Sequence, residues 1–328
     1  MKSLKSLSLF SGCMGMDLGM ELSGIEAIAF VDKDPACIET ITQNRPNAII
    51  FDDVFSNEMI AFAKKHRIDL VVGGPPCQSF STIGKRRFLK DDRGRAMLGF
   101  VSVVKAVRPS FFALENVPGL VSADKGGILL QIQLEFESLG YCVAWGIYNS
   151  AAFGVPQSRK RLVMIGRKGK VPVDMLKSPV HYGVCTLRKA IEDLENNPGE
   201  LLEFPKSIAR VMPKIPEGGC WKSLPAKERK KAMGNANLAS GGLTAFYRRL
   251  DYDKPCPTLL TSPVQRATTL CHPIKTRPLS VSEYKRVQCF PDDWKISGTI
   301  RDKYRQIGNA VPVLFGKAIG NAIVNMIN

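Results

Sequence analysis

The stretch LKSLSLFSGCMGMDLG, Leu4 to Gly19, joins an apolar strand to a helix through a glycine turn, and the fold can be inferred outward from this pattern. Glycines in such a turn let the backbone approach a ligand closely. Asp32 ends the next apolar run, 32 − 12 = 20 positions after Gly12, where an acid can bind ribose hydroxyls. The predicted elements are a strand at 4–10, a helix at 16–24 and a strand at 27–32. The pattern favours a nucleoside site over a plain tight turn, and leaves both a nicotinamide cofactor and S-adenosylmethionine open.

The same alternation of apolar runs and helical patterns continues to about residue 170. Further strands are predicted at 69–74, 110–117 and 161–166, and further helices at 35–44, 95–107 and 126–140. Strands that are apolar throughout and separated by helices predict an α/β fold with a parallel sheet covered on both faces. Beyond residue 170 prolines, glycines and lysines become frequent, which predicts a smaller, loop-rich domain. A helix at 278–290 and a helical tail follow.

Charge and cysteine usage narrow the class of protein. The 328 residues carry a net charge of +16, which points to an anionic partner, most often nucleic acid, although a basic enzyme with a solvated lysine-rich face has the same balance. The nine cysteines are scattered singly and form no CxxC pair, so neither a zinc site nor a disulfide framework is expected. No apolar run approaches the roughly 18 residues of a membrane span. We therefore expect no membrane association.

One cysteine has unusual neighbours, in GGPPCQSFS from Gly73 to Ser81. A lone cysteine is most often buried and inert. Here two prolines fix φ just before the thiol, at the carboxyl end of a predicted strand, where α/β sheets place ligands. A rigidly held thiol at that position is typical of a nucleophile.

Five motifs in order, FSGCMG, PPCQ, ENV, QSRKR and GNAVP, resemble the cytosine carbon-5 DNA methyltransferase family and span Phe10 to Pro312. The resemblance implies a Rossmann-like class I methyltransferase sheet, a second, smaller loop-rich target-recognition domain, and S-adenosylmethionine converted to S-adenosylhomocysteine. Two positions depart from the usual pattern. Met14 stands where the family has glycine, and Asp32 where it often has glutamate.

The resemblance also implies roles for individual residues. Cys77 is implied as the nucleophile, Glu115 as the acid that binds the base, and Arg159 and Arg161 as supporting arginines, with no metal. The implied cofactor contacts are Phe10, Gly12, Cys13, Gly15, Asp32, Lys33, Asp53, Val54, Pro75, Asn309, Ala310 and Val311. Addition of a thiolate to carbon 6 of cytosine would make carbon 5 reactive toward a methyl group.

The DNA-binding parts are expected in two places. The cationic segment 81–95, directly after Cys77, suits a loop that closes over DNA and a flipped-out cytosine. The expected division is a catalytic domain at 1–175 completed by 306–328, a target-recognition domain at 176–277 and a hinge at 278–305. Candidate DNA contacts are Gln78, Ser81, Lys85, Arg86, Arg87, Arg93, Gln157, Trp221, Arg248 and Arg249.

Several alternatives remain open from the sequence. A transfer-RNA cytosine methyltransferase would share the catalytic module, and a catalytically inactive DNA-binding regulator would share the fold. A nicotinamide oxidoreductase leaves PPCQ and ENV unexplained. We expect a monomer that acts on double-stranded DNA in the bacterial cytoplasm, associated with the nucleoid, alongside a cognate restriction endonuclease.

Overall fold

The computed structural model describes residues 3–76, 92–170, 176, 183–233 and 246–327. The chain divides into two compact units. Unit 1 comprises Met1–Phe153, Lys160–His181 and Ala310–Asn328, and unit 2 comprises Gly154–Arg159 and Tyr182–Asn309. The segment 278–305, expected as a hinge, falls within unit 2.

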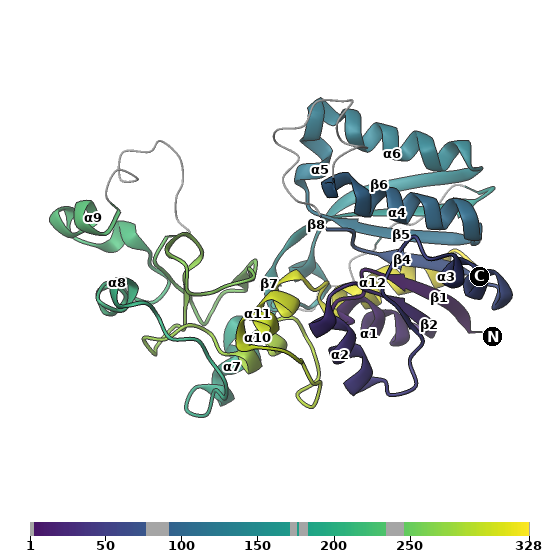
Figure 1. Cartoon of the computed structure of the whole chain (residues 1–328). Coiled ribbons are helices and arrows are strands. Elements are labelled where there is room, and N and C mark those ends of the chain that lie inside the picture. Colours follow the sequence, from purple (N-terminus) through teal and green to yellow (C-terminus); the bar gives the residue numbers. More distant parts are fainter. Residues whose placement is uncertain (1–2, 77–91, 171–175, 177–182, 234–245, 328) are drawn as a thin grey trace. The chain divides into compact units, whose positions relative to one another are not determined.

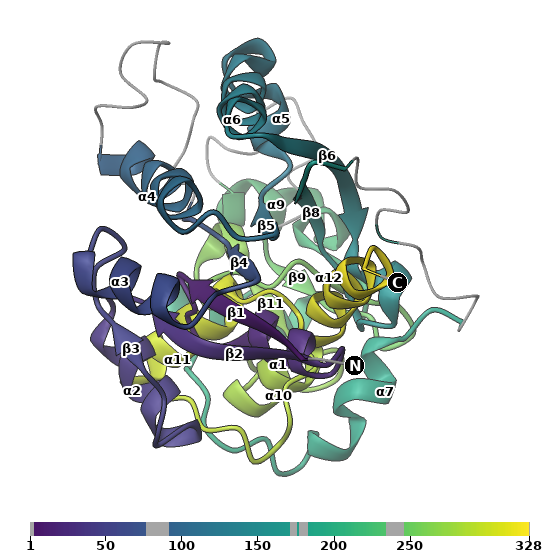
Figure 2. The same cartoon turned by 90° about the vertical axis from the view of Figure 1, so that its right-hand side faces the viewer.

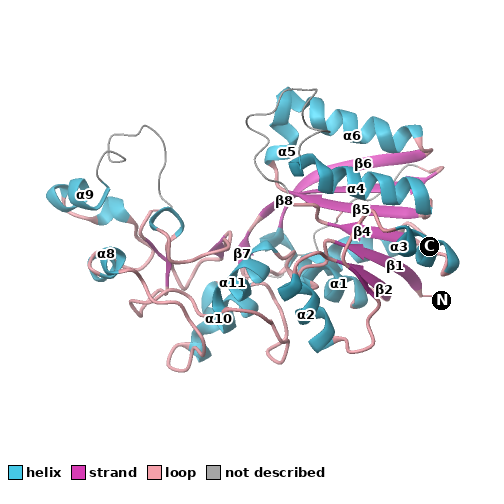
Figure 3. Cartoon of the chain, in the orientation of Figure 1, coloured by secondary structure: helices cyan, strands magenta, loops and turns pink. Residues whose placement is uncertain are grey.

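Unit 1 is built on a seven-stranded sheet with the order β3-β2-β1-β4-β5-β8-β6 (Figures 1 and 3). The strands are β1 (Leu4–Leu9), β2 (Ile25–Val31), β3 (Ile50–Phe51), β4 (Leu70–Gly73), β5 (Phe111–Asn116), β6 (Tyr141–Asn149) and β8 (Lys160–Lys168). The first five are parallel. The β4 and β5 strands lie side by side, so their carboxyl ends meet at one edge of the sheet.

The expectation of a wholly parallel sheet is corrected at β8. This strand pairs antiparallel with both β5 and β6. A parallel connection needs a crossover of a dozen or more residues, usually a helix, and only the short segment 150–159 separates β6 from β8. The β6 strand itself was not predicted, because it is a partly exposed edge strand rather than a continuous buried run.

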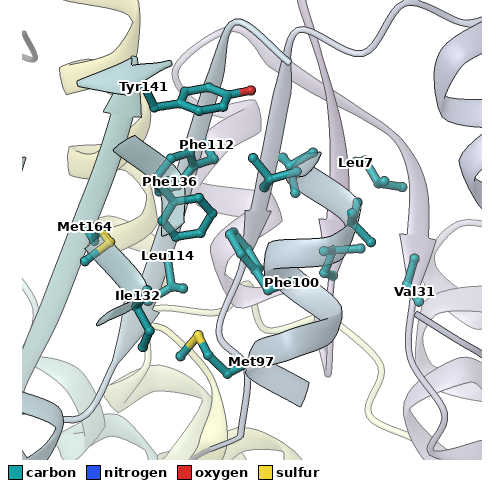
Figure 4. Packing of buried hydrophobic residues seen from close by; sticks show 14 of the residues in the cluster. Leu7, Val31, Met97, Phe100, Phe112, Leu114, Ile132, Phe136, Tyr141 and Met164 are labelled. Atoms are coloured by element: carbon teal, nitrogen blue, oxygen red, sulfur yellow. The ribbon is translucent and has the colours of Figure 1, made fainter. Parts of the chain in front are cut away.

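Helices cover both faces of this sheet (Figure 2). They are α1 (Gly15–Glu21), α2 (Pro35–Asn44), α3 (Asn57–Lys65), α4 (Asp92–Val107), α5 (Gly119–Ser122), α6 (Gly127–Ser138) and α12 (Val313–Asn325). A hydrophobic core forms between the sheet and α3, α4 and α6, with Phe100, Phe112 and Phe136 fully buried within it (Figure 4). Each such side chain contributes about 1.5–3 kcal/mol through burial.

The C-terminal helix α12 packs directly on α1. A Cβ added at Gly19 would lie 2.2 Å from the carbonyl oxygen of Val313 and 2.4 Å from the backbone nitrogen of Lys317. The two helices can therefore approach this closely only with glycine at position 19. The tail of the chain is in this way fixed against the helix that follows the glycine turn.

Unit 2 is rich in loops, as the sequence predicts. Its short strands pair as β7 (Gln157–Ser158) with β10 (Cys256–Pro257) and β9 (Arg248–Arg249) with β11 (Leu270–Cys271). Its helices are α7 (Leu187–Ile191), α8 (Lys206–Ala209), α9 (Ala226–Met233), α10 (Val281–Val287) and α11 (Ile300–Asn309). One stretch of the described chain, Ile300–Asn325, is long and apolar enough for a membrane span, but 61% of its apolar window is buried, as in core helices of soluble proteins.

Candidate active site

The turn between β1 and α1 adopts a rare backbone conformation. Phe10, Gly12 and Met14 all have left-handed φ angles, of 56°, 55° and 66°. A Cβ added at Gly12 would meet no atom within 4 Å, so the space beside this glycine is open to a ligand. Met14 tolerates its strained conformation with a completely buried side chain. Burial of the methionine side chain contributes favourable free energy that opposes the cost of the strained backbone.

Asp32 holds this turn from the end of β2. Its Oδ2 accepts a hydrogen bond from the Gly12 backbone N–H at 2.8 Å, and its Oδ1 accepts one from Asp34 N–H at 3.0 Å. The residue therefore fixes the glycine turn, a role that spacing alone did not reveal.

The acidic segment after β3 forms a turn of its own. The Asp53 carboxylate accepts a hydrogen bond from the backbone N–H of Phe55 at 3.0 Å, and its carbonyl accepts one from Ser56 N–H at 3.1 Å. Val54 lies so close to α4 that a Cβ on Gly99 would come within 2.6 Å of it. Asp53 and Lys33 are exposed, whereas Val54 is partly exposed.

A carboxylate and a guanidinium meet at the carboxyl end of β5, opposite the start of β8. Arg161 Nε lies 2.9 Å from Oε1 of Glu115, and both side chains are about one-tenth exposed. Burial lowers the pKa of Arg161, while the charge of Glu115 and its hydrogen bond to the arginine oppose that shift. The pair is mostly shielded from solvent, and it joins the acid that the resemblance assigns to the base with one of the two supporting arginines.

The Gly-Gly-Pro-Pro segment lies beside this pair. A Cβ added at Gly74 would stand 3.0 Å from Glu115 Oε2, so glycine leaves the carboxylate its space. The Asn116 amide donates a hydrogen bond to the carbonyl of Pro75 at 3.1 Å, and Asn116 is buried. Two consecutive residues of β5 thus contact the segment that ends one residue before Cys77. The sequence did not predict that Asn116 fixes the proline segment through this hydrogen bond.

Some predicted residues lie outside the described part of the chain. They are Cys77, Gln78, Ser81, Lys85, Arg86 and Arg87, together with the side chain of Arg93. Their assignments stay predictions.

Arg159 and Gln157 are both buried within unit 2. Arg159 donates to the carbonyl oxygens of Leu259, at 3.2 Å, and Asn309, at 3.5 Å. Gln157 donates to the Gln288 side chain at 2.8 Å and accepts from Leu259 N–H at 3.0 Å. Gln157 is therefore a buried connector, which corrects its expected contact with DNA.

Trp221 and Arg249 are also interior residues. Trp221 belongs to an apolar cluster with Ile208, Met212 and Leu224. Arg249, 5% exposed, donates to the carbonyls of Ile215 and Met212 at 2.7 and 2.8 Å. Its remaining bonds go to the carbonyls of His272, Pro273, Ile274 and Lys275 and to the Thr276 hydroxyl. Both residues brace the unit, which corrects their expected DNA contacts, while Arg248 stays a partly exposed candidate.

The remaining cofactor candidates lie in or next to the same elements. Cys13 is buried, and Gly15 begins α1. Ala310 and Val311 lie between α11, which ends at Asn309, and α12, which begins at Val313.

Asp17 is a buried acid that the sequence did not single out. It lies in the first turn of α1 and is 1% exposed. Burial raises its pKa to about 7, and the Ser8 hydroxyl opposes the shift. Because acids are common in the first turn of helices, nothing in the sequence distinguished this one from a solvated residue.

Known proteins resemble this chain along its full length. The family model for C-5 cytosine-specific DNA methylase matches residues 4–325. The Type II methyltransferase M.PspPI of Psychrobacter sp. (strain TA137) is 37% identical over 339 residues, covering 100% of this chain and 80% of the relative. M.Sau96I of Staphylococcus aureus is 37% identical over 332 residues, covering 100% and 77%. Among solved structures, an Escherichia coli prophage-encoded protein provisionally described as a DNA modification methyltransferase has a TM-score of 0.74 at 26% identity, covering 99% and 100% of the two chains.

Proposed function

Because the chain belongs to the C-5 cytosine-specific DNA methylase family, we propose that it transfers a methyl group from S-adenosylmethionine to carbon 5 of cytosine in duplex DNA. One observation in the structure carries the proposal. The buried Glu115–Arg161 pair lies beside the Gly-Gly-Pro-Pro segment that leads into Cys77. A binding module without chemistry would gain little from a buried ion pair, since desolvation offsets much of its attraction.

The turn after β1 fits the nucleoside part of the methyl donor. It combines open space beside Gly12, a helix start and the acceptor oxygens of Asp32, which suit ribose hydroxyls. Cys13 and Gly15 of that turn, with Phe10, Lys33, Asp53, Val54, Pro75, Asn309, Ala310 and Val311, complete the proposed contacts. The donor supplies an electrophilic methyl group on a sulfonium and leaves as S-adenosylhomocysteine.

Cys77 is proposed to supply the nucleophile. Its thiolate would form a bond to carbon 6 of cytosine, which places electron density on carbon 5. The methyl group then bonds to carbon 5 as its bond to sulfur in the donor breaks. Loss of the carbon-5 proton, for which we propose water as the acceptor, returns the electron pair and breaks the bond between the thiol and carbon 6. The Asn116–Pro75 bond fixes the described segment that ends one residue before this cysteine.

Glu115 and Arg161 are proposed to bind the base while it reacts. A proton shared by Glu115 would stabilise the ring at N3 and the exocyclic amine, and Arg161 would bond O2. The observed ion pair supports these roles, because it holds both groups at the same edge of the sheet with little exposure to solvent. Arg159 donates hydrogen bonds to the carbonyls of Leu259 and Asn309, so we propose that it holds these two backbone segments in place and does not touch the base.

DNA would be held by the segment after Cys77 and by unit 2. Ser81, Gln78 and the cations Lys85, Arg86, Arg87 and Arg93 are proposed contacts around a flipped-out cytosine. We propose that the region 176–277, including Arg248, selects the DNA sequence. The chain would act as a monomer in the bacterial cytoplasm, at the nucleoid, with a cognate restriction endonuclease cutting unmethylated copies of the same site.

A methyl-transfer assay tests the proposal. Tritiated methyl groups from S-adenosylmethionine should enter duplex DNA and be recovered as 5-methylcytosine. Transfer RNA in the same assay tests the main alternative, a transfer-RNA cytosine methyltransferase. Incorporation of the label into RNA but not into DNA would overturn the assignment to DNA. Absence of transfer to either acceptor would favour an inactive regulator.

A further inference from the structure

A groove in unit 2 is lined by a mixture of polar, charged and apolar residues. Its volume is about 790 Å³, roughly that of two dozen water molecules, so it is larger than a single small ion requires. Three segments line it, namely 202–208 at α8, 261–266 before β11, and 301–305 in α11. The last of these belongs to the stretch that the sequence predicted to be only a hinge.

The groove carries an excess of positive charge. Arg266, Arg301 and Arg305 line it, against the two carboxylates of Glu203 and Asp302, which leaves 3 − 2 = 1 net positive charge. Asp302 is already committed, because its Oδ2 accepts from the backbone and hydroxyl of Thr299 and its Oδ1 accepts from Arg305 at 2.8 Å. These bonds hold its pKa at about 2, so it stays ionised and bound to its partners.

Arg301 is the groove arginine whose side chain is available to bind a ligand. It is exposed, and its side chain makes no hydrogen bond or ion pair with any residue in the described part of the chain. Arg266 is exposed as well and lies near the Tyr247 hydroxyl. The hydroxyls of Ser207 and Ser262 add donors along the same groove. Guanidinium groups with nearby hydroxyls are the donors that phosphodiester oxygens accept from.

We propose that this groove binds the sugar-phosphate backbone of duplex DNA, with Arg301 and Arg266 as phosphate contacts and Arg305 as a cation positioned by Asp302. The inference rests on the proposed function and extends it, since it assigns α11 a part in holding the substrate. Contacts of this kind give affinity and register on the duplex, and carry no base sequence themselves.

The salt dependence of DNA binding tests this assignment. Removal of one phosphate-binding cation lowers the slope of log affinity against log salt by about 0.9. Arg301→Gln should therefore lower the slope by about 0.9, and Arg301→Gln with Arg266→Gln by about 1.8. Lys64→Gln, an exposed cation on α3, removes the same charge and should leave the slope unchanged. Because Arg301 bonds to no other residue that the structure describes, its replacement should leave the unfolding midpoint where it is, which circular dichroism checks.

Two further measurements separate the outcomes. Glu203→Gln should strengthen DNA binding at low salt, because it removes a negative charge facing the phosphates. Inorganic phosphate, titrated at constant ionic strength, should compete only weakly. Slopes of the arginine variants equal to that of the parent would overturn the proposal, and so would tight phosphate binding that Arg301→Gln abolishes without changing the DNA slope. If the arginine variants methylate DNA normally and their salt slopes are unchanged, the role of the groove is refuted but the proposed function is not. If the parent protein methylates no DNA, the proposed function is refuted.

Discussion

Glu115 and Arg161 form a buried ion pair, 2.9 Å from carboxylate to Nε, across the antiparallel strands β5 and β8. The reversed direction of β8 brings an arginine near the start of that strand to the carboxyl end of β5. A parallel β8 would place its carboxyl end there instead. The proposed chemistry therefore depends on the antiparallel direction of β8.

Loss of the arginine should abolish turnover while leaving the donor site intact. Arg161→Ala leaves the Glu115 carboxylate buried without its partner. Arg161→Lys keeps the positive charge but loses the planar guanidinium with its several hydrogen-bond donors. We expect single-turnover methyl transfer to fall at least about 100-fold, or about 2.7 kcal/mol, in Arg161→Ala. Affinity for S-adenosylmethionine should stay within about twofold. Lys160→Ala, the exposed neighbour on β8, serves as the control, and equal rates in the two variants would refute a specific role for Arg161.

The bond between Asn116 and Pro75 should set the rate through the position of Cys77. Asn116→Ala removes a buried donor and leaves the Pro75 carbonyl without that partner, at a cost of about 1–3 kcal/mol in stability. We expect slower methyl transfer with an unchanged KM for the methyl donor. Unfolding in urea and single-turnover kinetics measure the two effects. A less stable protein that reacts at the parental rate would show that the bond serves the fold alone.

Asp17 should make stability depend on pH. Its pKa is raised to about 7 in the folded protein, so the folded state binds the proton more tightly than the unfolded state. The contribution of Asp17 to the free energy of unfolding is then fully present below about pH 4. It is lost as pH rises through about 7, and the loss is on the order of 4 kcal/mol. Asp17→Asn should be less sensitive than the parent between about pH 5 and 8. Parallel pH profiles of the two unfolding free energies would contradict this.

Arg249 should stabilise unit 2 without reading DNA. Its guanidinium joins the 212–215 segment to the 272–276 loop, so Arg249→Ala leaves several buried carbonyls without donors. We expect a loss of about 3 kcal/mol or more of unfolding free energy, seen as early proteolysis within unit 2. Arg248→Ala, one residue earlier and partly exposed, should cost little stability. The opposite order of the two variants would restore a surface role for Arg249.

Local patterns in the sequence predicted most of unit 1. The buried runs of β1, β4 and β5 and the glycine turn after β1 could be read residue by residue, because burial on both faces leaves a continuous apolar signal. The β6 strand carries no such signal, since most of its side chains are partly exposed. The direction of β8 depends on the connection before it, which is a tertiary property. The family motifs located Glu115 and Arg161, but their contact became visible only in the folded chain.

The DNA contacts that were predicted from amino-acid composition alone were the least accurate predictions. Arginine and tryptophan in a basic region suggested DNA contacts, yet Arg249 and Trp221 are interior braces, because a loop-rich unit without long strands needs buried side chains to join its segments. The exposed arginines at 266 and 301 had no motif around them, and only the fold brings them to one groove.

Covalent trapping tests whether Cys77 bonds to the target cytosine. Duplex DNA carrying 5-fluorocytosine at the methylated position, incubated with the protein and S-adenosylmethionine, blocks the final step because fluorine does not leave as a proton does. We predict a stable protein–DNA adduct on a denaturing gel, with peptide mapping that places the bond on Cys77, and no adduct for Cys77→Ser. Normal methylation of the unfluorinated duplex with no adduct on the fluorinated one, or an adduct on another residue, would contradict it.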